Sequence, residues 1–323
     1  MLYPLKFKPI LKQTIWGGNK LSDKSDNPNI KNSIGESWEI SGVQDNISVV
    51  SAGNLAGNTL EELTEIYMGD LVGDKIYENF GIEFPLLIKY IDARENLSIQ
   101  VHPNDTTAKE RHNAYGKTEM WYLVEADPNA ELVIGFNRNS NQIKYLENLR
   151  HHTLPALLNI EKVEKGNCFF IPAGTVHAIC KGCFIAEIQQ TSDITYRIYD
   201  YDRRDKDGNL RELHTELATD VINFEQQKQH AIPYHIHKNH TEELVRCNYF
   251  TTNFLKFDKE IEKDYIELDS FVIYMCLEGK FTLVYDVDQT IQVNKGETIL
   301  VPAILKNLFL IPEQEVQLLE IYI

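Results

Sequence analysis

The chain has 323 residues, 43% of them apolar and 25% charged, which is typical of a globular protein with room for two hydrophobic cores. Its formal net charge is −16, from 48 acidic and 32 basic residues. A negative field of this size repels nucleic acid and anionic lipid, so we expect neither nucleic acid nor a membrane as a partner. An anionic ligand would need a local cluster of basic residues.

Cysteine usage and the N-terminal residues predict where the protein works. The five cysteines are sparse and odd in number, which favours reduced thiols over a disulfide framework. The first residues show no signal-peptide pattern, and no apolar run is long enough to span a bilayer. Together these features predict a cytoplasmic protein, and no obligate protein partner is evident.

Strand patterns dominate the chain. Runs rich in Val, Ile, Phe and Tyr, separated by Gly, Pro, Asn and Asp, predict strands at 84–91, 97–101, 120–124, 168–171, 184–189, 271–277 and 281–285. Helices are expected in three places: from the capping box Thr59–Glu62 to about Asn79, after Pro103, and over 141–158 with a break near Pro155. The pattern predicts a mainly β fold, a sandwich or barrel with a few inserted helices.

An internal repeat relates two distant segments. Lys165–Ala173 begins with Lys-Gly, continues as an apolar strand and ends with Pro-Ala, and Lys295–Ala303 repeats this pattern. Glycine permits a tight turn, and proline ends strand pairing because it has no N–H. We therefore expect two similar β units, joined through the polar segment 226–240.

Two predicted strands place polar side chains on one face. Because successive side chains of a strand alternate, Ser98, Gln100 and His102 share one face of the first strand, opposite an apolar face. In the second, Lys117 and Glu119 share a face. A strand that is apolar on one side and polar on the other suits a barrel that holds a ligand.

In a third segment, Ile171–His177, a Pro-Ala-Gly turn is followed by another histidine, which we expect at the start of a strand. Gln100, His102, Glu119 and His177 then form a set of two imidazoles, one carboxylate and one amide oxygen. This set suits Zn²⁺ or another borderline divalent ion, with positions left open for water or substrate. Four satisfied polar core residues are the alternative interpretation.

The chain resembles a known family on several spaced motifs that occur in the same order. These motifs are Trp16–Gly18, Ile34–Ser41, Pro85–Lys89, Leu97–Pro103, Lys117–Trp121, Ile171–His177 and Gln189–Asp202. They resemble the type I phosphomannose isomerases in their short bacterial form, over most of the chain.

The resemblance implies a fold of two cupin (jelly-roll-like) β-barrels with a few inserted helices. It divides the chain into a catalytic metal-binding cupin at 1–235, with N-terminal strands and helical insertions, and a second cupin at 240–323. It also implies one zinc ion per chain, held by Gln100, His102, Glu119 and His177, and an active-site arginine at Arg197. Counted from the repeated glycines, Asn307 stands where His177 stands in the first unit, so we expect the second cupin to be metal-free and structural.

The implied reaction interconverts mannose 6-phosphate and fructose 6-phosphate through an enediolate. A Lewis-acid metal would make the C–H next to the carbonyl acidic, and an acid and a base would move the proton. Lys117 is expected in one of these roles or on a substrate hydroxyl, and Arg197 is expected to stabilise negative charge. Ser98, Lys89 and Arg203 are expected to bind the phosphorylated hexose, whereas Arg204 fits a solvated turn.

One departure and two alternatives stay open. Longer members of the family carry histidine where this chain has Gly116, so the group that opens the sugar ring is unassigned. A non-catalytic sugar-binding or regulatory cupin would share the fold, as would another metal-dependent cupin enzyme such as an oxygenase or epimerase. The presence of both Lys117 and Arg197 favours the isomerase.

Overall fold

The computed structural model describes residues 2–25, 33–204, 208–227 and 230–323. Its contacts divide the chain into two compact units. The first β unit comprises 10–38 and 87–232, and the second β unit comprises 1–9, 39–86 and 233–323. Within the described residues, no helix is long and apolar enough to cross a bilayer.

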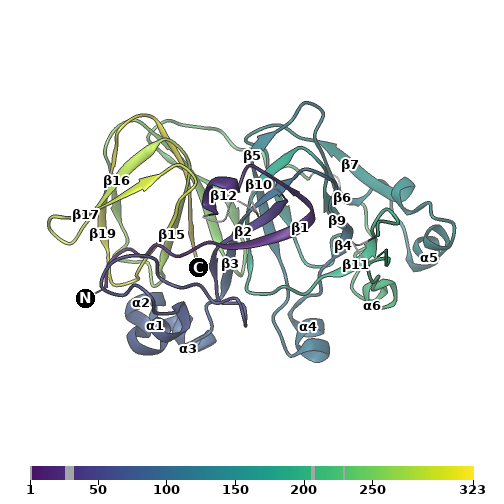
Figure 1. Ribbon diagram of the computed structural model, residues 1–323, viewed down its shortest axis with the longest axis horizontal. Coiled ribbons are helices and arrows are strands. Elements are labelled where there is room, and N and C mark those ends of the chain that lie inside the picture. The colour runs from purple at the N-terminus through teal and green to yellow at the C-terminus, as the bar shows by residue number, and fades with distance from the viewer. Residues whose placement is uncertain (1, 26–32, 205–207, 228–229) are drawn as a thin grey trace. The chain divides into compact units, whose positions relative to one another are not determined.

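The first β unit contains two sheets (Figure 1). One has the order β1 (Ile10–Gly18), β2 (Ile34–Ser41), β3 (Leu86–Ala93), β10 (Cys183–Gln190), β5 (Glu119–Ala126) and β8 (Cys168–Ile171). The other has the order β11 (Tyr196–Tyr199), β4 (Ile99–Val101), β9 (His177–Ile179), β6 (Glu131–Phe136) and β7 (Leu158–Lys162). Side chains from both sheets, including Trp121, Phe169 and Leu132, form one buried core between them.

The outer face of the second of these sheets is also covered. Helix α5 (Gln142–Arg150), the 3₁₀ turn η3 (Leu154–Leu157) and helix α6 (Thr215–Thr219) contribute to an apolar cluster that includes Ile99 and Val101. Strand β4 therefore has an apolar outer face, which leaves Gln100 on the inner face, as the alternation predicted. Helix α4 (Asp105–His112) follows β4, with Asn104 as its N-cap.

The second β unit also has two sheets. One has the order β12 (Thr241–Arg246), β13 (Thr251–Phe257), β20 (Val316–Tyr322), β15 (Val272–Glu278) and β18 (Thr298–Val301). The other has the order β14 (Ile261–Asp264), β19 (Asn307–Pro312), β16 (Lys280–Tyr285) and β17 (Gln289–Asn294). Each unit is thus a pair of open sheets around a core rather than a closed barrel, and the fold is mainly β and cupin-like, as predicted.

The internal repeat is a structural repeat. Gly166 and Gly296 both have positive φ, 89° and 80°, which favours glycine. Their N–H groups donate to equivalent carbonyls, Gly166 to Leu123 at 2.8 Å and Gly296 to Cys276 at 2.7 Å. The strands that follow are β8 and β18, which pair with β5 and β15 respectively.

Three short helices belong to the second β unit: α1 (Leu60–Tyr67), α2 (Gly69–Val72) and α3 (Asp74–Phe80). The predicted capping box is present, because Thr59 accepts from the N–H of Glu62 at 3.1 Å and the Glu62 carboxylate accepts from the N–H of Thr59 at 2.8 Å. Asp269 accepts from the N–H of Asp74 at 2.8 Å, which fixes α3 within this unit.

The grouping of the N-terminal third of the chain differs from the predicted boundary at 235–240. Residues 1–9 and 39–86 belong with the second β unit, because Leu5 and Leu300 exchange backbone hydrogen bonds of 2.7 and 2.9 Å, and the N–H of Ala303 donates to Leu71 at 2.9 Å. The predicted linker 226–240 contains residues 228–229, which lie outside the described residues.

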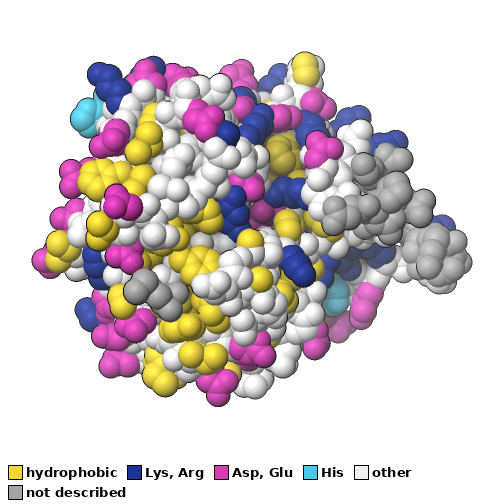
Figure 2. Space-filling model, turned by 60° about the vertical axis from the view of Figure 1, so that its left-hand side comes forward, with side chains coloured by type: hydrophobic (Ala, Val, Ile, Leu, Met, Phe, Trp, Pro, Cys, Tyr) yellow, Lys and Arg dark blue, Asp and Glu magenta, His cyan; other side chains and the backbone are white. Residues whose placement is uncertain are grey.

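Acidic side chains are spread over the face of the molecule shown in Figure 2.

Candidate metal centre and active-site cleft

Three side chains of the first β unit meet in its interior. His102 follows β4, Glu119 begins β5 and His177 begins β9. Each is at most 1% exposed, and one ligand atom from each lies within 4.8 Å of the others. The His102 Nε2 is 3.5 Å from one Glu119 carboxylate oxygen, and the His177 Nε2 is 3.3 Å from the other. The sequence predicted this cluster.

Backbone carbonyls fix the orientation of both imidazoles. The Nδ1 of His102 lies 2.9 Å from the carbonyl oxygen of Ile194, and the Nδ1 of His177 lies 2.8 Å from that of Thr175. A carbonyl can only accept, so each Nδ1 carries the proton and donates. Each Nε2 therefore presents a bare lone pair toward Glu119, which is the arrangement that metal-binding histidines use.

The protonation states and the unsatisfied atoms fit a cation. Burial lowers the pKa of His177 to about 4 and that of His102 well below its usual value, so both rings are neutral. Both Nε2 atoms and both Glu119 oxygens lack a hydrogen-bond partner among the described residues. Buried polar atoms without partners are costly, and a bound cation would satisfy all four at once. These residues therefore fit a divalent metal ion.

The fourth predicted ligand lies beside this cluster. Gln100 is directly opposite His177 in the β4–β9 pairing, on the inner face of the sheet. Lys117 is also adjacent, with its ammonium 3.5 Å from a Glu119 oxygen. Burial, followed by repulsion from Glu187, raises the pKa of Glu119 to about 8, and the positive charges of Lys117 and Lys89 oppose this rise. A metal cation would act in the same direction as these lysines.

A cleft of about 230 Å³ opens next to the cluster, entirely within the first β unit. Ser98, Gln100, Lys89, Lys117 and Arg197 line it, so five of the predicted site residues lie where a ligand could reach them. Other polar lining residues were not predicted; these are Glu36, Glu187, Ser192, Asp193, Thr195 and Arg211. The cleft combines a cationic set with several hydrogen-bonding groups, which suits a small, polar, anionic ligand.

Lys89 lines the cleft, but its charge is already matched. Its ammonium is 2.8 Å from a Glu187 oxygen and 3.4 Å from a Glu36 oxygen. Burial alone would lower the pKa of Lys89, but these two carboxylates more than offset burial and raise it. Trp121 donates through Nε1 to Glu187 at 2.6 Å, and Trp38 donates to Glu36 at 2.7 Å. Each of the two carboxylates that pair with Lys89 thus also accepts a hydrogen bond from a tryptophan.

The predicted arginines occupy different places. Arg197 is opposite Gln100 in the β11–β4 pairing and lines the cleft, and its guanidinium donates to the carbonyl of Glu212 at 2.9 Å. Arg203 does not line the cleft; its guanidinium donates to the carbonyl of Asn96 and forms an ion pair with Asp200. Arg211 lines the cleft, although no sequence motif indicated it.

The comparisons with known proteins agree with this site. A family model described as the phosphomannose isomerase type I catalytic domain matches residues 4–139. The mannose-6-phosphate isomerase ManA of Bacillus subtilis is 36% identical over 306 residues, which is 93% of each chain. The chain belongs to the type I phosphomannose isomerases.

Two further matches extend along the chain. The mannose-6-phosphate isomerase of Streptococcus mutans is 33% identical over 313 residues, 95% of each chain. The crystal structure of the mannose 6-phosphate isomerase from Bacillus subtilis is 32% identical, covers 100% of both chains and has a TM-score of 0.88. Both β units of this phosphomannose isomerase therefore have counterparts in its relatives.

The departure at Gly116 has a structural reason. A Cβ at this position would lie 2.5 Å from the backbone nitrogen of Asp105 and 2.6 Å from the carbonyl carbon of Asn104. The N–H of Gly116 donates to the Asp105 side chain at 2.9 Å, so the chain passes close to the N-terminus of α4. No side chain fits here unless α4 shifts. This isomerase therefore cannot place a histidine side chain at this position in the present geometry.

Proposed function

We propose that this chain interconverts mannose 6-phosphate and fructose 6-phosphate, with zinc held by Gln100, His102, Glu119 and His177. The observation that carries the proposal is the buried pair of neutral imidazoles aimed at Glu119, next to a cleft lined by Gln100, Lys117 and Arg197. Two nitrogens, a carboxylate and an amide oxygen suit zinc and leave room for substrate. The family relationship gives the substrate class.

The residues around the cluster would divide the chemistry. A bound zinc ion would supply Lewis-acid polarisation of the sugar carbonyl. The Lys117 ammonium, 3.5 Å from Glu119, is placed to hold or move a proton near C1 and C2, or to bind a hydroxyl there. Arg197 is permanently charged and lies opposite Gln100, so it is placed to stabilise the negative charge of the enediolate. Ser98 offers a hydroxyl to the substrate from the same strand face.

We also infer a cytoplasmic location. All five cysteines are free, and three of them, Cys168, Cys183 and Cys276, are buried. Burial raises the pKa of Cys180 to about 11 and that of Cys183 to about 12, so this Cys-x-x-Cys pair lacks the thiolate that a redox site requires. Unpaired, unreactive thiols are typical of a reducing compartment.

The proposed function is tested by following fructose 6-phosphate formed from mannose 6-phosphate in a coupled assay. Glucose 6-phosphate and unphosphorylated mannose are assayed in parallel as comparison compounds. We expect turnover of mannose 6-phosphate that is lost after treatment with a chelator and returns on addition of Zn²⁺. Full activity after chelation and dialysis, with no metal detected in the protein, would contradict the metal assignment. No conversion by metal-loaded protein would contradict the isomerase.

A further inference from the structure

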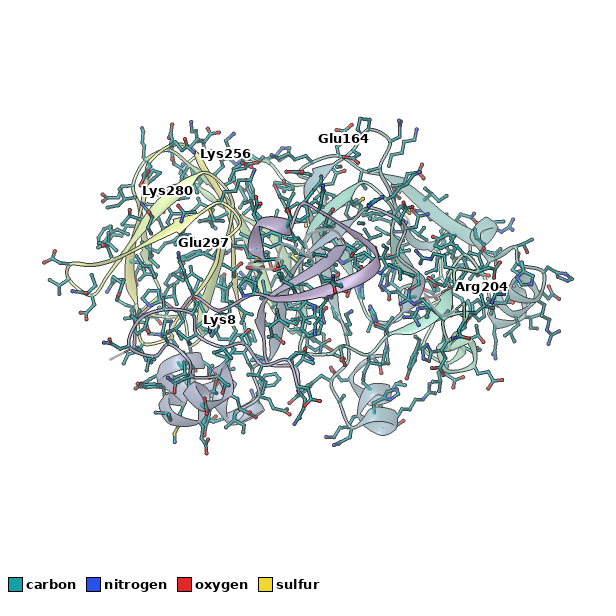
Figure 3. The ribbon with its side chains drawn as sticks, in the orientation of Figure 1. Lys8, Glu164, Arg204, Lys256, Lys280 and Glu297 are labelled. Carbon is teal, nitrogen blue, oxygen red and sulfur yellow. The ribbon has the colours of Figure 1, made fainter. Side chains whose placement is uncertain are left out.

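Arg211 reaches the cleft through a return of the chain after β11. Arg204 and Leu210 form an isolated antiparallel bridge, and Arg204, labelled in Figure 3, donates to the carbonyl of Gly208 at 2.6 Å. The chain then runs back beside β11, where the N–H of His214 donates to the carbonyl of Arg197 at 2.7 Å. Arg211 and Arg197 thereby both line the cleft.

Three arginines lie near one another here. Arg203 and Arg211 both pair with one buried carboxylate, that of Asp200, which is 4% exposed, and the carboxylate of Asp193 also lines the cleft. Within the described part of the chain Arg197 forms no ion pair, and the carboxylate of Glu212 points largely to solvent. Burial and then the positive charge of nearby Arg211 lower the pKa of Arg197. The surroundings of Lys89 differ, because two carboxylates already match its charge.

The two arginines that pair with Asp200 are not equivalent. Arg203 has four contacts: it donates to the carbonyls of Asn96 and Asp200, pairs with the Asp200 carboxylate, and lies over the ring of Tyr201 at 5.3 Å. Arg211 approaches Asp200 only at 3.4 and 3.5 Å, and its side chain remains 28% exposed. Asp200 therefore orients Arg211 without using all of its donors, and several N–H groups stay available to a ligand in the cleft.

We propose that Arg211 binds the phosphate group of the substrate. This rests on the proposed function. In a hexose 6-phosphate the phosphate is at the opposite end of the carbon chain from C1 and C2, so its binding group must lie away from the metal cluster. Arg197 is opposite Gln100 at the cluster, whereas Arg211 lies beyond the end of β11 beside Asp200. A guanidinium matches phosphate oxygens with two parallel hydrogen bonds.

Arg203 offers a matched control for Arg211, because both pair with Asp200 and only Arg211 lines the cleft. In metal-loaded enzyme, Arg211→Ala should raise KM for mannose 6-phosphate by about tenfold or more, the loss expected for charge-assisted hydrogen bonds, with a smaller change in kcat. Inorganic phosphate should inhibit this variant more weakly than the wild type, and Arg211→Lys should recover part of the affinity. Arg203→Ala, or Arg203→Lys if the alanine variant does not fold, should keep KM within about twofold.

Two results would overturn the proposal: an unchanged KM and unchanged phosphate inhibition in folded Arg211→Ala, or an equal rise in KM in the folded Arg203 variant. A failure of the proposed function can be distinguished from a failure of the phosphate-binding proposal. If the wild type does not convert mannose 6-phosphate, direct titration with inorganic phosphate still compares the two variants. Weaker phosphate binding in Arg211→Ala alone would then support the anion site, and equal binding in all proteins would overturn it.

Discussion

Two histidine side chains are prepared for metal binding by the backbone rather than by other side chains. The carbonyls of Ile194 and Thr175 hold the Nδ1 protons of His102 and His177, so both Nε2 lone pairs converge on Glu119. Rotating either ring would lose a hydrogen bond of about 1 kcal/mol in a site that water does not reach. The geometry is therefore built before a cation binds.

Substitution of one imidazole tests the cluster. We expect His102→Ala to lose most bound metal and most activity while the protein stays folded, because one nitrogen ligand is removed from a set that closes around the ion. Elemental analysis of the purified variant gives the metal content, and circular dichroism checks the fold. His151→Ala, at an exposed position beyond α5, is the control and should keep its metal. A full metal complement in the His102 variant would contradict the assignment.

Substitution of Arg197 distinguishes charge stabilisation from metal binding. Arg197→Ala should retain the metal, since no ligand changes, but kcat should fall by about 10²–10³-fold, the usual loss when one group that stabilises developing charge is removed. The measurement is steady-state kinetics on protein with a known metal content. A metal-loaded variant with near-normal kcat would show that Arg197 has another role.

Some site residues could be predicted from the sequence because strand alternation is local. Gln100 lies on β4, and Ser98 and His102 directly flank that strand at a spacing of two residues, so their shared face follows from the extended backbone alone. Arg211 could not be predicted, because it reaches the cleft through the bridge between Arg204 and Leu210 and an ion pair with Asp200. Nothing local to residues 208–211 indicates that contact.

At the scale of strands, the repeat relates two buried ion pairs. Glu187 is opposite Trp121 in the β10–β5 pairing, and Trp121 is opposite Phe169. In the second β unit, Glu320 is opposite Tyr274, and Tyr274 is opposite Ile299, which matches Phe169 in the repeat. Each glutamate pairs with a buried lysine, Glu187 with Lys89 at 2.8 Å and Glu320 with Lys263 at 2.9 Å.

The two pairs differ in their surroundings. Glu187 and Lys89 line the cleft, whereas Glu320 is enclosed by Asn253, which donates to it at 2.9 Å, and by the Tyr265 hydroxyl. We expect Glu320→Gln to lower the free energy of unfolding by about 3 kcal/mol, because it leaves the ammonium of Lys263 without its counter-charge. Urea unfolding measures this. The kcat of folded protein should not change, and a large fall in kcat would contradict a structural role for this pair.

Close packing at the N-terminus of α4 explains why the chain has glycine at 116. Gly116→Ala should destabilise the protein by about 1–3 kcal/mol and reduce activity, because a methyl group overlaps the backbone of Asn104 and Asp105. Gly81→Ala is the control: its Cβ would meet nothing within 4 Å, but its φ of 60° and ψ of −126° form a backbone conformation that favours glycine. We expect this conformation to cost about 1–3 kcal/mol without changing kcat. Equal activity in both variants would contradict the packing argument.

Most elements follow from the sequence because their signals are short-range. The capping box at Thr59 starts α1, Asn104 caps α4, and the Val- and Ile-rich runs form strands. The Lys181–Gly182 pair suggests a β-hairpin, but β9 and β10 lie in different sheets, so the turn at Gly182 carries the chain from one sheet to the other and closes no hairpin. The pairing of β4 with β11 and β9 could not be predicted, since it joins segments 70 or more residues apart.

At the scale of the whole molecule, the two units are not continuous in sequence. Residues 1–9 and 39–86 group with 233–323, whereas 10–38 groups with 87–232. The boundaries after residues 38 and 86 fall inside β2 and at the start of β3, so no linker or turn marks where the chain passes from one core to the other. The fold class was predictable from strand content and the repeat, but this exchange depends on pairing between distant residues, such as Leu5 with Leu300.

Because the net charge is −16, binding of an anionic substrate depends on the basic side chains that line the cleft. A phosphorylated sugar is repelled by the overall field and attracted only near cationic side chains such as Arg197 and Arg211, which line the cleft. Catalysis then depends on the cluster and cleft of one β unit. We propose that this unit moves a proton between C1 and C2 of the open-chain sugar, with Lys117 beside the cluster.

Isomerisation of mannose 6-phosphate in heavy water, followed by NMR, tests this claim most directly. A proton transfer exchanges with solvent, so we expect deuterium at C1 of the fructose 6-phosphate formed and at C2 of the recovered mannose 6-phosphate. Partial labelling agrees with the account, because a shielded group can return its original proton. Fructose 6-phosphate with no deuterium under both slow and fast turnover would show a direct hydride shift and contradict the role given to Lys117.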